Sequence, residues 1–139
     1  GHFFLKDGFH GYDDGLFGGL KLCELVAAGS GPLSATLAKA PQYVTSPEIH
    51  VDCADEVKYG VMDRVLAEMK RDLPGRVNDV NGARVTFDDG WGLVRPSSNL
   101  PELVLVFEGK TREAMDRAKQ AFRARLARHP EIGSVWHNE

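Results

Sequence analysis

A polar segment between two apolar stretches carries the side chains of this sequence that are best suited to chemistry. It runs Arg95, Pro96, Ser97, Ser98, Asn99, Leu100 and Pro101. An arginine guanidinium is a planar, permanently charged fork that matches a phosphate bidentately, and serine and asparagine add neutral donors. The candidate phosphate ligands are therefore Arg95, Ser97, Ser98 and Asn99. A second interpretation stays open, because Pro, Ser and Asn also form ordinary surface turns.

A second group of candidates lies near the amino terminus. Histidine titrates near neutral pH, so His2 is a candidate for a hydrogen bond to a sugar hydroxyl or for proton transfer; the alternative is an exposed terminal residue without a function. The neighbouring carboxylates Asp13 and Asp14 suit acid–base or metal chemistry, but at a predicted helix start they more commonly cap the helix. Because no two histidines lie at the helical spacing of metal ligands, we expect no metal site in this chain.

The overall charge argues against a general nucleic-acid binder. The chain has 139 residues with 17 basic and 20 acidic side chains, a net charge of −3, so no excess of Lys and Arg is present to release phosphate counterions. Basic residues gather on one face of the last predicted helix, but Glu113 and Asp116 are interleaved and no aromatic residue accompanies them for base stacking. A solvated face is the favoured interpretation.

Length and composition are those of an ordinary globular chain. With 42% hydrophobic and 27% charged residues, one core can form without a disulfide or a metal. Cys23 and Cys53 form no C-x-x-C pair, which favours a reducing, cytoplasmic compartment. No apolar run approaches the roughly 20 residues of a membrane span, and no secretory signal is visible. The chain begins at Gly1 with an apolar run behind it, which indicates a piece of a longer protein.

The periodicity of the chain predicts two parts. Phe3–Leu5 reads as a strand, residues 13–28 as a helix that is apolar over most of its surface, and residues 33–37 as a short helix. Pro41 and Pro47 bracket an extended connector. We therefore place a boundary at residues 42–48.

The second part has the pattern of an α+β domain. Residues 49–53 alternate as a half-buried strand, and residues 55–73 form an amphipathic helix that Asp55 can cap. Asn81-Gly82 is a strong hairpin signal between strands 77–80 and 84–87. Strands 91–95 and 103–107 follow, and then a helix that begins after Thr111 and ends near His129. Hairpin links require the helices to cover one face of the sheet.

These segments, in this order, resemble the C-terminal end of the α-D-phosphohexomutase family, specifically the bacterial phosphomannomutase/phosphoglucomutase enzymes. The residues that carry the likeness are Gly1-His2-Phe3-Phe4, Tyr12-Asp13-Asp14-Gly15, Asp89-Gly90-Trp91-Gly92-Leu93-Val94-Arg95, Ser97, Pro101 and Leu103-Val104-Leu105-Val106-Phe107-Glu108. The first group is similar to the tail of the family's sugar-specificity loop and the helix start after it. The later groups are similar to its last domain.

The resemblance implies a fold and a set of site residues. Residues 1–43 would be the remnant of a third, α/β domain, 44–48 a linker, 49–130 the fourth domain and 131–139 a tail. That fourth domain would be an antiparallel four-stranded sheet with two helices on one face, like the TATA-binding protein. Arg95 and Ser97 would bind the substrate phosphate, and His2 the sugar. The family commonly has Asn-Thr or Gly-Thr where Ser98-Asn99 stands here, and both residues still carry donors.

The resemblance also implies an activity that this chain completes but does not perform alone. A phosphoserine would transfer its phosphoryl group reversibly to a mannose or glucose 1- or 6-phosphate, and an aspartate cluster would bind Mg²⁺. Both would lie in earlier domains outside this chain. The partners would be the hexose phosphate and the N-terminal domains. Two other classes stay open: a free-standing α+β ligand-binding or interaction module without catalysis, and, disfavoured by charge, a nucleic-acid binder.

Overall fold

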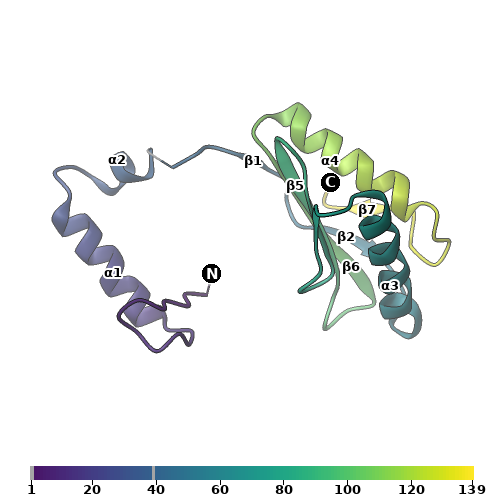
Figure 1. Cartoon of the computed structure of the whole chain (residues 1–139), viewed down its shortest axis with the longest axis horizontal. Coiled ribbons are helices and arrows are strands. Elements are labelled where there is room, and N and C mark those ends of the chain that lie inside the picture. Colours follow the sequence, from purple (N-terminus) through teal and green to yellow (C-terminus); the bar gives the residue numbers. More distant parts are fainter. Residues whose placement is uncertain (1, 39) are drawn as a thin grey trace. The chain divides into compact units, whose positions relative to one another are not determined.

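The computed structural model describes residues 2–38 and 40–139 (Figure 1). The chain divides into two compact units, one ending at Pro41 and one running from Gln42 to Glu139. Among the described residues, no helix has both the length and the apolar character of a membrane span.

The first unit contains two helices, α1 (Gly15–Ala28) and α2 (Leu33–Leu37). The Asp14 carboxylate caps α1 by accepting a hydrogen bond from the Phe17 N–H at 2.8 Å. The predicted strand at Phe3–Leu5 is wrong: only an isolated antiparallel bridge between Phe4 and Asp13 forms. A strand needs neighbours for its backbone groups, and this unit supplies no further strand among its described residues. Large apolar side chains of α1 are exposed: Leu16, Leu20, Leu22, Leu25 and Val26.

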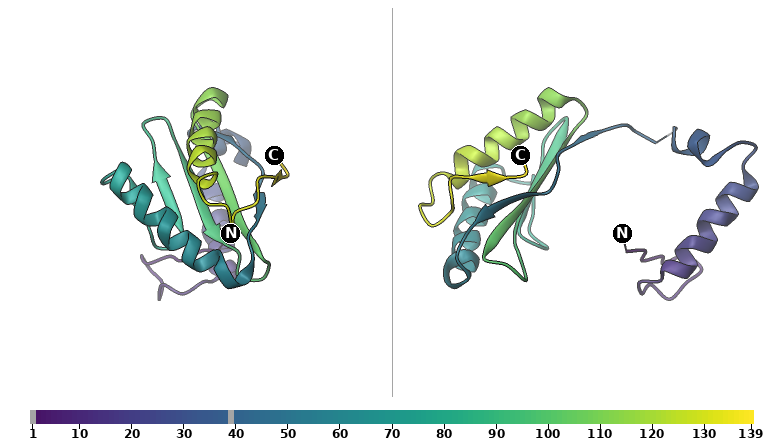
Figure 2. Two further views of the ribbon diagram at one scale, coloured as in Figure 1. Left: turned by 90° about the vertical axis from the view of Figure 1, so that its right-hand side faces the viewer. Right: turned by 180° about the vertical axis from the view of Figure 1, so that it is seen from behind.

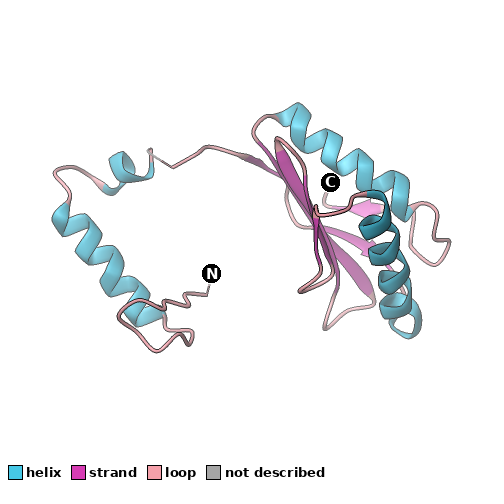
Figure 3. Cartoon of the chain, in the orientation of Figure 1, coloured by secondary structure: helices cyan, strands magenta, loops and turns pink. Residues whose placement is uncertain are grey.

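The second unit is an antiparallel sheet with two helices, as expected for the α+β class (Figure 3). Its strands are β1 (Val44–Thr45), β2 (Ile49–Asp52), β3 (Val77–Asn78), β4 (Ala83–Thr86), β5 (Gly90–Pro96), β6 (Glu102–Gly109) and β7 (Trp136–His137). The order is β3-β4-β5-β6-β2-β7, and β1 also pairs with β6. Helices α3 (Asp55–Asp72) and α4 (Arg112–Leu126) pack on one face of this sheet (Figure 2).

The sheet is wider than the four strands expected, because short strands extend it. The expected linker 44–48 contains β1, and the buried Ser46 after it continues the pairing through a 2.9 Å hydrogen bond from its N–H to the Phe107 carbonyl. The expected tail 131–139 contains β7, which pairs with β2 and buries Trp136 against Phe107. Two-residue strands are too short for a periodicity, so only their long-range partners define them.

An aromatic pair in the core packs against one face of β5. Phe107 of β6 and Phe122 of α4 meet edge to face, with ring centroids 5.3 Å apart. Gly92 of β5 faces this pair, and a Cβ atom there would lie 2.7 Å from the Phe122 ring. Gly92 and Val94 thus point to the helices, and because side chains alternate along a strand, Arg95 falls on the open face.

Candidate functional site

The loop between β5 and β6 is ordered by one hydroxyl. The Ser97 Oγ accepts hydrogen bonds from the N–H groups of Asn99 (3.4 Å) and Leu100 (3.2 Å), and the Ser97 N–H donates to the Glu102 carbonyl at 3.0 Å. Ser97 is buried, whereas Ser98 and Asn99 are exposed. A serine hydroxyl that accepts two bonds keeps its own hydrogen to donate. The loop therefore offers donors to an anion while its backbone stays folded.

Beneath this loop lies a lysine that the sequence patterns did not single out. The Lys58 side chain is only 3% exposed, and its Nζ donates to the carbonyls of Ser97 (2.7 Å) and Leu100 (2.9 Å) and to Asp55 Oδ1 (2.5 Å). Asp55 thus binds Lys58, and the N-cap position belongs to Ala54 rather than to Asp55 as expected. The sequence did contain a signal for its burial, because Lys58 lies three residues before Val61 and so falls on the apolar stripe of the predicted helix.

Arg95 reaches across the open face of the sheet. It lies opposite Val104 of β6, and its Nη2 is 3.5 Å from Oε1 of Glu48, the residue before β2. The Arg95 side chain is 32% exposed and that of Glu48 is 53% exposed, so this long ion pair is weak and easily displaced. The structure therefore places Arg95 two residues before the loop, but engages it with Glu48 and not with Ser97.

In the first unit, the candidate sugar ligand His2 is held by the carboxylate of Asp13. His2 Nδ1 lies 2.5 Å from Asp13 Oδ2, and the Phe3 N–H donates to Asp13 Oδ1 at 2.9 Å. The hydrogen bond from His2 is the main cause that lowers the pKa of the Asp13 carboxyl below its usual value. Of the two adjacent aspartates, only Asp14 caps α1, and Asp13 orients His2 instead.

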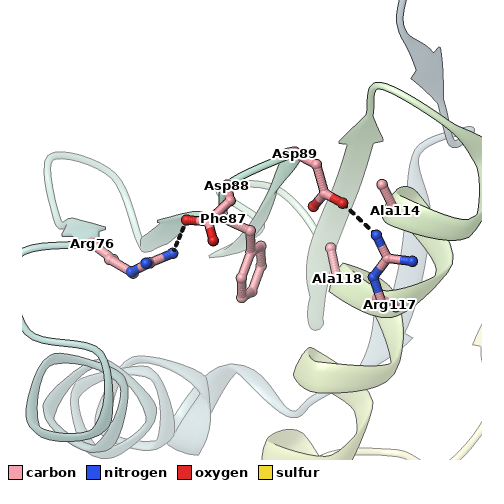
Figure 4. Close-up of a pocket in the computed structure, with 7 residues that line it drawn as sticks. All are labelled: Arg76, Phe87, Asp88, Asp89, Ala114, Arg117 and Ala118. Carbon is pink, nitrogen blue, oxygen red and sulfur yellow. Dashed lines mark hydrogen bonds and ion pairs between the residues drawn. The ribbon is translucent and has the colours of Figure 1, made fainter.

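A hollow lies at the opposite end of β5 from the loop, and its lining carries equal numbers of positive and negative side chains. It has a volume of about 370 Å³ and lies between the β4–β5 turn and α4. In Figure 4 Asp88 points to Arg76, with 2.9 Å between Oδ1 and Nη1, and Asp89 points to Arg117. Two carboxylates and two guanidinium groups line this hollow, so its lining carries no net positive charge for a phosphate. Throughout the described part of the chain, no three His, Cys, Asp or Glu side chains gather as a metal site requires.

Comparison with known proteins shows which family the chain belongs to. Residues 48–125 match the model of the phosphoglucomutase/phosphomannomutase C-terminal domain. The chain belongs to this family. The matched range of this phosphoglucomutase/phosphomannomutase domain contains Arg95, the loop after it and Lys58, whereas His2 lies outside it.

The relatives agree with this assignment. A phosphomannomutase/phosphoglucomutase of Pseudomonas putida is 35% identical over 95% of this chain, and a phosphoglucomutase of Neisseria meningitidis is 34% identical over 98%. A solved structure of a phosphoglucomutase/phosphomannomutase family protein from Burkholderia thailandensis is 38% identical over 94% of this chain, with a TM-score of 0.76. The chain spans 27–29% of the length of these three proteins. The family resemblance is confirmed, and the roles of individual ligands stay predictions.

Proposed function

We propose that this chain binds the substrate phosphate for a phosphohexomutase that interconverts the 1- and 6-phosphates of a hexose, mannose or glucose. The observation that carries the proposal is the loop after Arg95, which holds its own carbonyls inward on Lys58 and leaves Ser98 and Asn99 exposed beside a displaceable guanidinium. Family membership supports the same substrate class.

The chemistry of a mutase explains why such a loop is useful. A sugar phosphate must bind in two orientations, so one site has to hold the phosphate that does not react. Arg95, Ser97, Ser98 and Asn99 would perform that task by positioning and electrostatics, without making or breaking bonds. His2, oriented by Asp13, would contact the sugar. The implied Mg²⁺ does not fit the described residues, which offer no cluster of carboxylates, and we assign it to earlier domains.

An amide-resolved titration tests this proposal. When glucose 6-phosphate is added to the 139-residue chain, ¹H–¹⁵N resonances of residues 95–99 should shift, and glucose without a phosphate should leave them unchanged. A free-standing module in which these residues form an ordinary turn predicts no localised response. That result would remove the proposed function and leave the fold unaffected.

The Arg95–Glu48 pair leads to a testable gain of affinity. In the free chain the phosphate must displace the Glu48 carboxylate, and an exposed ion pair contributes about 0.2–1 kcal/mol. Glu48→Gln should therefore raise the affinity for glucose 6-phosphate by a factor of about 1.5 to 5. The matched control is Glu131→Gln, which breaks the exposed pair with Arg64 instead. Unchanged or weaker binding by Glu48→Gln would mean that Arg95 does not hold the phosphate.

The chain alone should have no mutase activity. We assign the phosphoserine that the proposed reaction requires to earlier domains, so the chain alone would have no phosphoryl group to exchange. We expect no conversion of mannose 1-phosphate to mannose 6-phosphate by the purified chain in a coupled assay, with or without Mg²⁺. Sustained turnover proportional to the concentration of the chain would contradict this.

A further inference from the structure

Lys58 is a buried cation whose contacts account for each of its donors. Its ammonium has three N–H groups, and three acceptors surround it: the carbonyls of Ser97 and Leu100 and the Asp55 carboxylate. Burying a charge is costly unless it is paired and hydrogen-bonded. A methionine or leucine would fill the same helix position at lower cost. The reason for a lysine at this position therefore lies in the groups that its hydrogen bonds fix in place.

The geometry of the peptide unit shows what they hold. The peptide between Ser97 and Ser98 is trans, so its C=O and N–H point in opposite directions. Because Lys58 draws the Ser97 carbonyl inward, the Ser98 N–H is directed outward. Within the described part of the chain, no acceptor pairs with this N–H, whereas the next two amides are bound by the Ser97 hydroxyl. The Ser98 N–H is thus the backbone donor of the loop that is free for a ligand.

We propose that Lys58 is a positioning residue for phosphate binding, which fixes the Ser97–Ser98 peptide so that the Ser98 N–H faces the anion beside Arg95. This inference rests on the proposed function. Without the ammonium, the Leu100 carbonyl keeps the Glu102 N–H as a donor at 2.8 Å, but the Ser97 carbonyl has no other donor in the described part of the chain. The Ser97–Ser98 peptide is then free to rotate its N–H away from the ligand. A merely structural lysine would change the stability of the fold but not the phosphate affinity of the folded protein.

The first experiment replaces Lys58 by a side chain of similar length that has no charge and no hydrogen-bond donor. Lys58→Met in the 139-residue chain should bind inorganic phosphate and glucose 6-phosphate at least tenfold more weakly, and the ligand-induced shift of the Ser98 amide should disappear. Lys70→Met is the matched control, because Lys70 lies on the same helix but is exposed and pairs with Asp79; its affinity should stay within twofold. Lys58→Gln, whose amide has two N–H groups for the two carbonyls, should restore most of the affinity.

A second pair of variants tests the N–H itself and does not depend on the folding of Lys58→Met. Ser98→Pro deletes the N–H, and Ser98→Ala keeps it, while both lack the hydroxyl. We expect Ser98→Pro to bind at least fivefold more weakly than Ser98→Ala. Equal affinities for these two, or wild-type affinity and an unchanged Ser98 shift in Lys58→Met, would overturn the inference. A wild-type chain that binds no phosphate would instead overturn the proposed function, and this inference with it.

Discussion

Arg95→Ala is expected to weaken glucose 6-phosphate binding roughly 10- to 150-fold. A hydrogen bond to a charged group contributes about 1.5–3 kcal/mol net, and each 1.4 kcal/mol is a factor of ten in affinity. The loss should be near the upper end, because a guanidinium binds a phosphate through two parallel hydrogen bonds. Titration monitored by ¹H–¹⁵N spectra measures the dissociation constant and shows at the same time whether the amides of residues 97–99 still respond.

The control for this prediction is another arginine on the same sheet face. Arg84 of β4 stacks over the Trp91 ring, with its Cζ 4.5 Å from the centroid, and carries the same charge. Arg84→Ala should change the affinity by less than twofold. Equal losses of affinity in the two variants would indicate that the positive charges on this sheet face attract the anion without a specific site. Normal binding by Arg95→Ala would remove Arg95 from the site altogether.

The parts of the fold that were predictable have long, repeated patterns. The stripe of α3 and the capping residue Thr111 of α4 are local signals, and the structure has both, with the Thr111 hydroxyl accepting from the Ala114 N–H at 3.2 Å. Likewise, the turn at Asn81-Gly82 is formed with a positive φ at Gly82. Phe3–Leu5 failed for the opposite reason, since an apolar run becomes a strand only when a partner strand is present.

The site was predictable in its residue types but not in its hydrogen bonds. The loop after Arg95 stood out because polar donors interrupt two apolar strands. Lys58 did not, because it is 39 residues away from Ser97 in the sequence and meets it only when α3 packs against the sheet. Asp13 was read as a cap because helix starts favour carboxylates, yet its contact with His2 spans 11 residues of chain. Long-range contacts of this kind leave no local pattern.

The core that holds β5 in place should be the most sensitive part of the second unit. Phe122 is 1% exposed and packs against Phe107 and beside Gly92. Phe122→Ala removes this ring and leaves a cavity, so we expect the free energy of unfolding to fall by about 3–5 kcal/mol. A domain of this size has about 5–15 kcal/mol in total, so the variant should be close to unfolding at 37 °C.

Urea denaturation followed by tryptophan fluorescence measures this loss in the second unit alone, because both tryptophans of the chain, Trp91 and Trp136, belong to it. Val80→Ala is the control: Val80 is 88% exposed, and its truncation should change the free energy of unfolding by less than about 0.5 kcal/mol. A loss below about 1 kcal/mol for Phe122→Ala would mean that α4 does not pack on β5. Pairing with β4 and β6 would still set the register of β5, but the ring of Phe122 would then not cover Gly92 on the inner face of the strand.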